Sequence, residues 1–166
     1  VRSLLELARR KKNTNPKVTL VNINKAIENS IGELNSHAMY KIVNIKKELL
    51  PDLPMIPDMG IESLFSNILK NALDALEERG CISISTALND GSIEIVISDT
   101  GCGISRDDMD HIFEPFFTTK EITKGAGLGL TICDDIVKRY NGTIEVFSEI
   151  GRGTSFVIHI PYKDKR

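Results

Sequence analysis

The sequence predicts an α/β fold in which helices and strands alternate without the regular β-α-β repeat of a parallel sheet. Residues 61–78 carry apolar side chains at helical spacing. Residues 81–88 and 92–98 carry alternating isoleucines on either side of an Asn-Asp-Gly turn, which is typical of a β-hairpin. A second helical pattern begins at Leu128 and is followed by two strand patterns, 143–148 and 154–160. Together these observations indicate one α/β domain.

Size and composition are those of an ordinary globular protein. The 166 residues are 41% hydrophobic and 27% charged, enough for one domain with a proper core. The net charge of −2 gives no electrostatic case for nucleic acid, and no apolar run approaches the roughly 20 residues of a membrane span. We therefore expect a soluble segment that contacts neither nucleic acid nor membrane.

The three cysteines, Cys81, Cys102 and Cys133, show no metal-binding spacing. They suit a reducing compartment, most simply the cytoplasm. We expect Cys81 and Cys133 to be small core residues.

The first part of the chain is predicted as a helix end, a linker and a new helix. Residues 1–12 carry leucines followed by a basic cluster, and residues 13–17, NTNPK, break that pattern. After a short extended piece over residues 18–21, Asn22 is placed to cap a helix. The apolar positions of that helix are Ile23, Ile27, Ile31 and Leu34.

Residues 40–49 alternate in polarity and predict a strand. Pro51, Pro54 and Pro57 then predict a turn-rich connector without a regular element.

The helix predicted for Ile61–Glu78 has the clearest apolar stripe in the sequence. Off that stripe, Asn67 and Asn71 lie one turn apart, with Lys70 and Asp74 beside them. Asparagine is a mediocre helix former, so two on one side need a reason. A hydrated polar face is the alternative explanation.

The second strand of the hairpin runs into Asp99-Thr100-Gly101-Cys102-Gly103-Ile104. An acid at the end of a buried strand, followed by two glycines, is a frequent arrangement at ligand sites. A simple turn with a capping aspartate is the alternative.

The stretch 113–130, FEPFFTTKEITKGAGLGL, is interpreted as a flexible lid over a nucleotide. Gly125, Gly127 and Gly129 precede a helix, and a helix N-terminus favours an anion such as phosphate. An ordinary loop-to-helix joint is the alternative. We expect Phe113, Phe116 and Phe117 to anchor the hinge of the lid in the apolar core, and residues 118–124 to be disordered without nucleotide.

The order and separation of these motifs resemble the ATP-binding catalytic domain of sensor histidine kinases, within the superfamily of DNA gyrase, Hsp90 and MutL. The matching motifs are Asn67-x-x-x-Asn71-Ala72, Asp99-x-Gly101-x-Gly103, FEPFF, Gly125-x-Gly127-Leu128-Gly129-Leu130 and Gly151-x-Gly153-Thr154. The resemblance covers residues 19–162. It implies a two-layer sandwich of a mixed β-sheet with helices packed on one face and a flexible ATP lid. Neither a GxxxxGK[ST] loop nor a GxGxxG fingerprint occurs in the sequence.

The resemblance also implies a role for each matching residue. Asn71 would coordinate Mg²⁺ through its side-chain oxygen, a ligand type that Mg²⁺ prefers. Asp99 would accept a hydrogen bond from the adenine amine, and Thr154 would help to hold adenine through water. The residues expected to contact ATP are Asn67, Lys70, Asn71, Asp74, Asp99, Gly101, Gly103, Ile104, Lys120, Gly125, Gly127, Leu128, Gly129, Leu130 and Thr154.

One position departs from the family pattern. Many members carry a basic residue three positions after the magnesium asparagine, where this chain has Asp74. Lys70 is one candidate for the missing positive charge, and Lys120 or Lys124 is the other.

One turn before the magnesium ligand, the hydrolysing branch of the superfamily commonly has a glutamate base, and this chain has Asn67. An amide cannot act as a general base. We therefore expect Asn67 and Lys70 to act in phosphoryl transfer by positioning and charge neutralisation.

The phosphoacceptor histidine is expected to lie outside this chain. His37, His111 and His159 are not followed by an acidic residue, as family acceptors typically are, and His159 falls in a strand pattern. Residues 1–17 are interpreted as the remnant of the second dimerisation helix and a linker, and residues 18–166 as the catalytic domain.

The expected function is transfer of the ATP γ-phosphate to a histidine on the dimerisation hairpin of a two-component sensor kinase, from which a response regulator would be charged. We do not expect the chain to autophosphorylate alone, and its parent protein is a candidate for membrane anchoring. A non-catalytic nucleotide-binding module and an ATPase are the alternatives.

Overall fold

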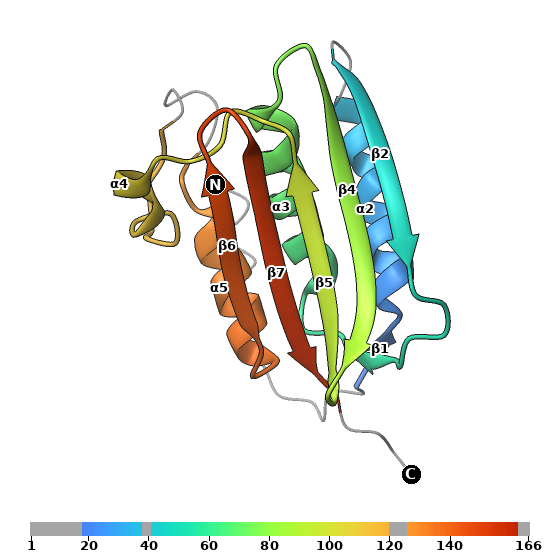
Figure 1. The fold of residues 1–166 in the computed structure, drawn as a ribbon. Coiled ribbons are helices and arrows are strands. Elements are labelled where there is room, and N and C mark those ends of the chain that lie inside the picture. The colour runs from blue at the N-terminus through green and yellow to red at the C-terminus, as the bar shows by residue number, and fades with distance from the viewer. Residues whose placement is uncertain (1–17, 38–40, 120–125, 163–166) are drawn as a thin grey trace.

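The computed structural model describes residues 18–37, 41–119 and 126–162. It is a two-layer α/β sandwich, with a sheet on one side and helices on the other (Figure 1). This confirms the predicted fold class. The expectations for residues 1–17, Lys120, Lys124 and Gly125 lie outside the described residues.

The main sheet has five strands in the order β2-β4-β5-β7-β6. Strands β2 and β4 are parallel, and the other neighbouring pairs are antiparallel, so the sheet is mixed as expected. The strands are β2 (Ile42–Leu49), β4 (Arg79–Asn89), β5 (Ser92–Asp99), β6 (Thr143–Glu149) and β7 (Gly153–Pro161). The central register places Asp99 at the end of β5, one step beyond the pair Ser98 and Ser155.

Three helices cover one face of this sheet: α2 (Ile23–His37), α3 (Ile61–Ala75) and α5 (Gly129–Arg139) (Figure 1). The backbone N–H of Lys25 donates to Oδ1 of Asn22 at 3.0 Å, which confirms the predicted cap of α2. The isoleucines on the inner face of the sheet form one core with the apolar stripes of the helices. Cys133 is fully buried in this core as expected, whereas Cys81 is only half-buried.

The proline-rich connector contains a short strand, contrary to the prediction. β3 (Ile56–Pro57) pairs antiparallel with β1 (Leu20–Val21), and the N–H of Asp58 donates to the carbonyl of Thr19 at 2.8 Å. Pro57 has no N–H to offer a ladder, and such a residue is tolerated at the edge of a two-stranded pair.

Helix α3 ends at Ala75, three residues before the predicted end. Leu76 is extended, with ψ of 145°, and the Lys41 ammonium donates to the carbonyls of Leu73 at 2.8 Å and Leu76 at 2.5 Å. A cation from the residue just before β2 therefore satisfies carbonyls that the end of α3 leaves open. Periodicity within the helix could not reveal a partner 35 residues away.

A short helix, α4 (Arg106–Met109), was not predicted. Ser105 caps it, since Ser105 Oγ accepts from the N–H of Asp108 at 3.1 Å and donates to Asp108 Oδ2 at 2.6 Å. The sequence signal was the Ser-x-x-Asp spacing, a capping-box variant.

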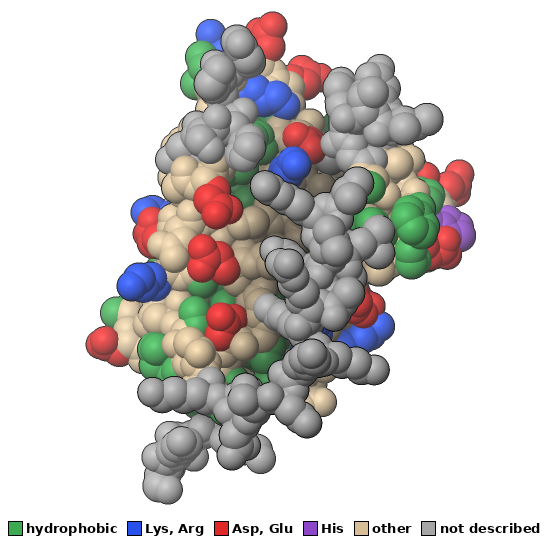
Figure 2. All heavy atoms as spheres, turned by 180° about the vertical axis from the view of Figure 1, so that it is seen from behind, with side chains coloured by type: hydrophobic (Ala, Val, Ile, Leu, Met, Phe, Trp, Pro, Cys, Tyr) green, Lys and Arg blue, Asp and Glu red, His purple; other side chains and the backbone are tan. Residues whose placement is uncertain are grey.

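The helical side of the molecule carries charges of both signs. Figure 2 shows Asp and Glu side chains interspersed with Lys and Arg on the part of this face that is not drawn in grey. In the described part of the chain, no helix combines the length and the hydrophobicity that a membrane crossing requires.

Candidate nucleotide-binding site

A cleft of about 640 Å³ opens beside α3, between the loop after β5 and the N-terminal end of α5. It brings together most of the predicted site residues, which are separated by up to 87 positions in the sequence. The predicted residues that line it are Asn67, Lys70, Asn71, Asp74, Asp99, Gly103, Ile104, Gly127, Leu128, Gly129, Leu130 and Thr154.

Asp99 forms the closed end of the cleft. Only 7% of the residue is exposed. Its Oδ1 accepts from the N–H of Gly101 at 2.8 Å and from the N–H of Thr154 at 3.3 Å. Burial raises the pKa of the Asp99 carboxyl, and these two backbone hydrogen bonds oppose that rise. Because both backbone donors use Oδ1, the other oxygen can accept from a ligand.

Gly101 does not line the cleft but sets the loop against α3. A Cβ at Gly101 would lie 2.7 Å from both the Cβ and the carbonyl oxygen of Ala75. Next along the chain, the N–H of Cys102 donates to that same carbonyl at 3.0 Å. The physical need for glycine here is close packing on the end of α3.

The turn between β6 and β7 holds the same loop from the other side. The N–H of Gly151 donates to the carbonyl of Cys102 at 2.8 Å. Gly103 has φ of +73°, and a Cβ there would lie 2.2 Å from the carbonyl oxygen of Glu149. The loop after β5 is therefore fixed between α3 and the β6–β7 turn.

The polar face of α3 meets the beginning of α5 across the cleft. Asn67 Nδ2 donates to the carbonyl of Ser63 at 2.9 Å, which fixes the orientation of the amide. A Cβ at Gly129 would lie 3.3 Å from Asn67 Oδ1, so glycine lets the first turn of α5 approach this side chain. The backbone end of α5 and the amide of α3 thus face the same space.

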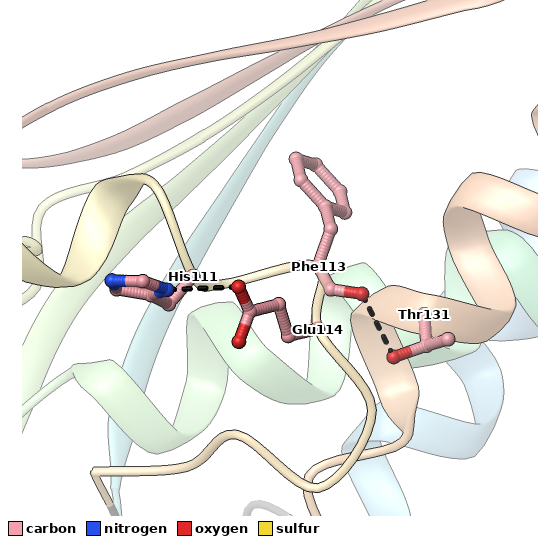
Figure 3. A network of polar contacts seen from close by, with 4 residues as sticks. All are labelled: His111, Phe113, Glu114 and Thr131. Carbon is pink, nitrogen blue, oxygen red and sulfur yellow. Dashed lines mark hydrogen bonds and ion pairs between the residues drawn. The ribbon is translucent and has the colours of Figure 1, made fainter.

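The two ends of the predicted lid meet at its base. The N–H of Phe116 donates to the carbonyl of Gly127 at 2.9 Å. Gly127 has φ of +66°, and a Cβ there would lie 2.5 Å from the carbonyl carbon of Phe116. On the helix side, Thr131 Oγ1 donates to the carbonyl of Phe113 at 3.1 Å (Figure 3).

The prediction that all three phenylalanines anchor the hinge in the core is wrong for Phe116. Its side chain is 73% exposed, while Phe113 and Phe117 are half-buried and Phe117 lines the cleft. Phe116 has φ of +68°, a turn conformation that the hydrogen bond to Gly127 accompanies. Composition could not show that the backbone turns at this residue.

His111 stands beside the lid base at the surface. Its Nδ1 lies 2.9 Å from Glu114 Oε1 (Figure 3), and its ring centroid lies 5.8 Å from that of Phe117. The hydrogen bond and charge of Glu114 raise the pKa of His111.

Comparison with known proteins identifies the family. A sequence profile described as histidine kinase-, DNA gyrase B- and HSP90-like ATPase matches residues 58–164. The chain belongs to this ATPase family.

The relatives place the chain within the sensor histidine kinases, as an ATP-binding catalytic domain. It is 33% identical to the sensor histidine kinase ZraS of Escherichia coli over 97% of this chain and 34% of ZraS. It is 36% identical to sporulation kinase D of Bacillus subtilis, over 82% of this chain and 28% of that kinase. The chain thus spans about a third of the length of these relatives.

Solved structures agree. The nucleotide-free catalytic domain of histidine kinase ThkA has a TM-score of 0.76 and 26% identity, covering 87% of this chain and 95% of that one. Full-length ShkA in complex with AMPPNP has a TM-score of 0.78 and 25% identity, covering 96% of this chain and 34% of that one.

Several residues of the cleft were missed by sequence reasoning. Ala72, Ala75, Ile132 and Phe156 belong to apolar patterns that were assigned to the core, and Thr118, Thr119 and Ala126 lie at the ends of the lid. The remaining residues are Cys102, Asp108, Ile112 and Phe117. Cys102 could have been inferred from its place between the two glycines of the kinase motif. The position of Asp108 at the cleft depends on the short helix α4, which was not predicted.

The donor set of the cleft fits a nucleotide with a magnesium ion. Among the described residues, no three His, Cys, Asp or Glu side chains gather as a metal site. A metal ion here would rely on an amide oxygen such as that of Asn71 and on ligand oxygens, which is how Mg²⁺ is usually held beside phosphates. The N-terminus of α5 offers backbone N–H groups for the phosphates themselves.

Proposed function

We propose that this chain binds Mg-ATP and transfers its γ-phosphate to a histidine on the dimerisation hairpin of a two-component sensor kinase. The observation that carries the proposal is that one cleft joins a buried carboxylate, Asp99, to the N-terminus of α5. The family membership and the AMPPNP bound to ShkA support it.

Adenine would occupy the closed end of this cleft. The cleft-facing oxygen of Asp99 accepts from the adenine amine, Ile104 contacts the base, and Thr154 offers its hydroxyl at the same end. Gly101 and Gly103 keep the loop in place because neither position tolerates a side chain. A 6-amino purine is therefore favoured over a 6-oxo purine.

The phosphates would lie at the beginning of α5. The backbone N–H groups of Gly127, Leu128 and Gly129 bind phosphate oxygens there, aided by the helix dipole. Asn71, one turn after Asn67 on α3, holds Mg²⁺, which neutralises phosphate charge when bound. Lys70 adds positive charge beside Asp74, while Lys120 and Gly125 are assigned to the lid from the family motif alone.

Phosphoryl transfer would proceed without a protein base. Asn67 orients phosphate or metal and takes no proton, because an amide has no useful basicity. The acceptor imidazole nitrogen forms a bond to the γ-phosphorus as the bond to the bridging oxygen breaks, giving phosphohistidine and ADP. Catalysis then rests on positioning and charge neutralisation.

The acceptor would come from another segment or another chain. Of the histidines whose side chains the structure describes, His111 pairs with Glu114, and His159 lies on β7 with Nε2 3.8 Å from Glu94 Oε2. We assign residues 1–17 to the end of the dimerisation hairpin and residues 18–166 to the catalytic domain, with a response regulator as the final phosphate acceptor. The three free thiols and the use of ATP suit the cytoplasm.

The test is a transfer assay with separated parts. The chain is incubated with γ-labelled Mg-ATP, alone and with the dimerisation hairpin of a related sensor kinase such as ZraS. We expect no label on the chain itself and label on the hairpin. Asn71→Asp places a second negative charge beside the phosphates and should weaken ATP binding at least about tenfold.

The outcomes separate the alternatives. Tight ATP binding without transfer to any related hairpin would favour a nucleotide-binding module. Steady ATP turnover by the isolated chain would favour an ATPase. Unchanged ATP affinity in both Asn71→Asp and Asp99→Asn would place the ligand elsewhere.

A further inference from the structure

One serine hydroxyl connects the two segments that form the closed end of the cleft. Ser148 is half-buried near the end of β6. Its Oγ accepts from the N–H of Ile104 at 2.8 Å, lies 3.0 Å from the carbonyl oxygen of Gly153, and lies 2.9 Å from Thr154 Oγ1. Ile104 and Thr154 both line the cleft, whereas Ser148 itself lies behind it.

These three partners use the full capacity of a hydroxyl group, which has one donor and two acceptor sites. The N–H of Ile104 can only donate, so it occupies one acceptor site of Ser148. The carbonyl of Gly153 can only accept, so it takes the single Ser148 proton. The remaining contact therefore requires Thr154 to donate its hydroxyl proton to Ser148.

The direction of this proton decides what Thr154 offers to a ligand. With its proton turned toward Ser148, Thr154 Oγ1 presents only lone pairs to the cleft. Asp99 lies directly beside it, because Asp99 Oδ1 accepts from the Thr154 N–H at 3.3 Å, and its carboxylate is a second acceptor. The closed end is therefore lined by two acceptors that suit a ligand donor such as an amino group.

We propose that Ser148 is a specificity-determining residue that fixes the Thr154 hydroxyl as an acceptor and so discriminates 6-amino from 6-oxo purine nucleotides. The inference rests on the proposed binding of ATP in this cleft and deepens it. Ser148 acts through Thr154 and is a positioning residue.

Inosine triphosphate is the probe, because its purine carries an oxygen acceptor in place of the amino group. The dissociation constants of Mg-ATP and Mg-ITP are measured for the chain and for Ser148→Ala. The variant frees the Thr154 proton to turn toward the 6-oxygen. We expect the ITP-to-ATP ratio of dissociation constants to fall by about threefold to tenfold, the range of one neutral hydrogen bond.

Matched variants separate this role from a general structural one. Ser148→Thr keeps the hydroxyl and should restore the ratio. Ser92→Ala removes a hydroxyl that donates to the carbonyl of Asn89 at 2.8 Å, at the far end of β5, and should leave the ratio unchanged. Adding Ser148→Ala to Thr154→Val should not change the ratio further, because no hydroxyl remains to reorient.

Equal weakening of ATP and ITP by Ser148→Ala, with the ratio preserved, would overturn the proposal. Should that variant unfold, Thr154→Val is measured instead; it removes the acceptor, and a preserved ratio would again overturn the proposal. Failure of the unaltered chain to bind either nucleotide would instead contradict the proposed function.

Discussion

Replacing Asp99 by asparagine changes the chemistry of the closed end of the cleft while keeping its shape. The asparagine Oδ1 can still accept from the N–H groups of Gly101 and Thr154, so the loop should keep its position. The cleft-facing oxygen becomes an amide NH₂, which donates where the carboxylate accepted. The substitution therefore removes the expected hydrogen bond to the adenine amine. The NH₂ group of the asparagine and the amino group of adenine, both donors, would then face each other.

The expected loss follows from the value of a hydrogen bond to a charged group. Such a bond is worth about 1.5–3 kcal/mol. At 1.4 kcal/mol for each tenfold change, Mg-ATP should bind roughly 10- to 150-fold more weakly to Asp99→Asn. Isothermal titration calorimetry measures the affinity, and thermal unfolding of the same samples shows whether the variant is folded.

A folded Asp99→Asn chain whose ATP affinity stays within about twofold of the original would refute this reasoning. The pH dependence of stability offers an independent check. Because burial raises the pKa of Asp99 above 3.8, its contribution to stability is fully present below pH 3.8 and is lost as the pH rises through the folded-state pKa. Relative to the original chain, Asp99→Asn should therefore become more stable as the pH rises through that window, as measured by chemical denaturation.

Three other predictions concern the surroundings of the cleft. Gly103→Ala should destabilise the chain by more than about 2 kcal/mol in urea denaturation, because Gly103 has a positive φ and a Cβ there would meet the backbone of Glu149. Gly32→Ala, in open space on α2, should instead stabilise the chain by about 0.5–1 kcal/mol. Lys41→Met should cost about 1–3 kcal/mol in the same assay by leaving the end of α3 without its cation. The pKa of His111, followed by NMR, should lie above 6.5 and fall in Glu114→Gln.

Each of these has an outcome that would contradict it. Equal effects of the two glycine substitutions would show that the loop relaxes around a Cβ. Full stability of Lys41→Met would mean that water replaces the ammonium at no cost. An unchanged His111 titration in Glu114→Gln would show that the pair does not persist in solution.

Local patterns determined the elements that lie within one stretch of chain. The alternating isoleucines of β5 fixed its buried face, and the Asn-Asp-Gly turn fixed its pairing with β4, because both signals depend on neighbouring residues. The polar positions Asn67 and Asn71 were found by helical spacing alone, since they lie one turn apart on α3.

Only the tertiary structure decided what depends on residues far apart in sequence. Lys41 satisfies the carbonyls at the early end of α3, and the exposure of Phe116 accompanies its turn against Gly127. The proton direction at Thr154 depends on Ser148, which pattern reasoning gave no cause to notice. The sequence by itself thus determined the family, through the order of its motifs. It also determined the strands of the main sheet and the polar face of α3, through the spacing of neighbouring residues. The carbonyl contacts of Lys41, the turn at Phe116 and the hydroxyl network of Ser148 could be found only in the folded structure, because the residues involved meet only when the chain is packed.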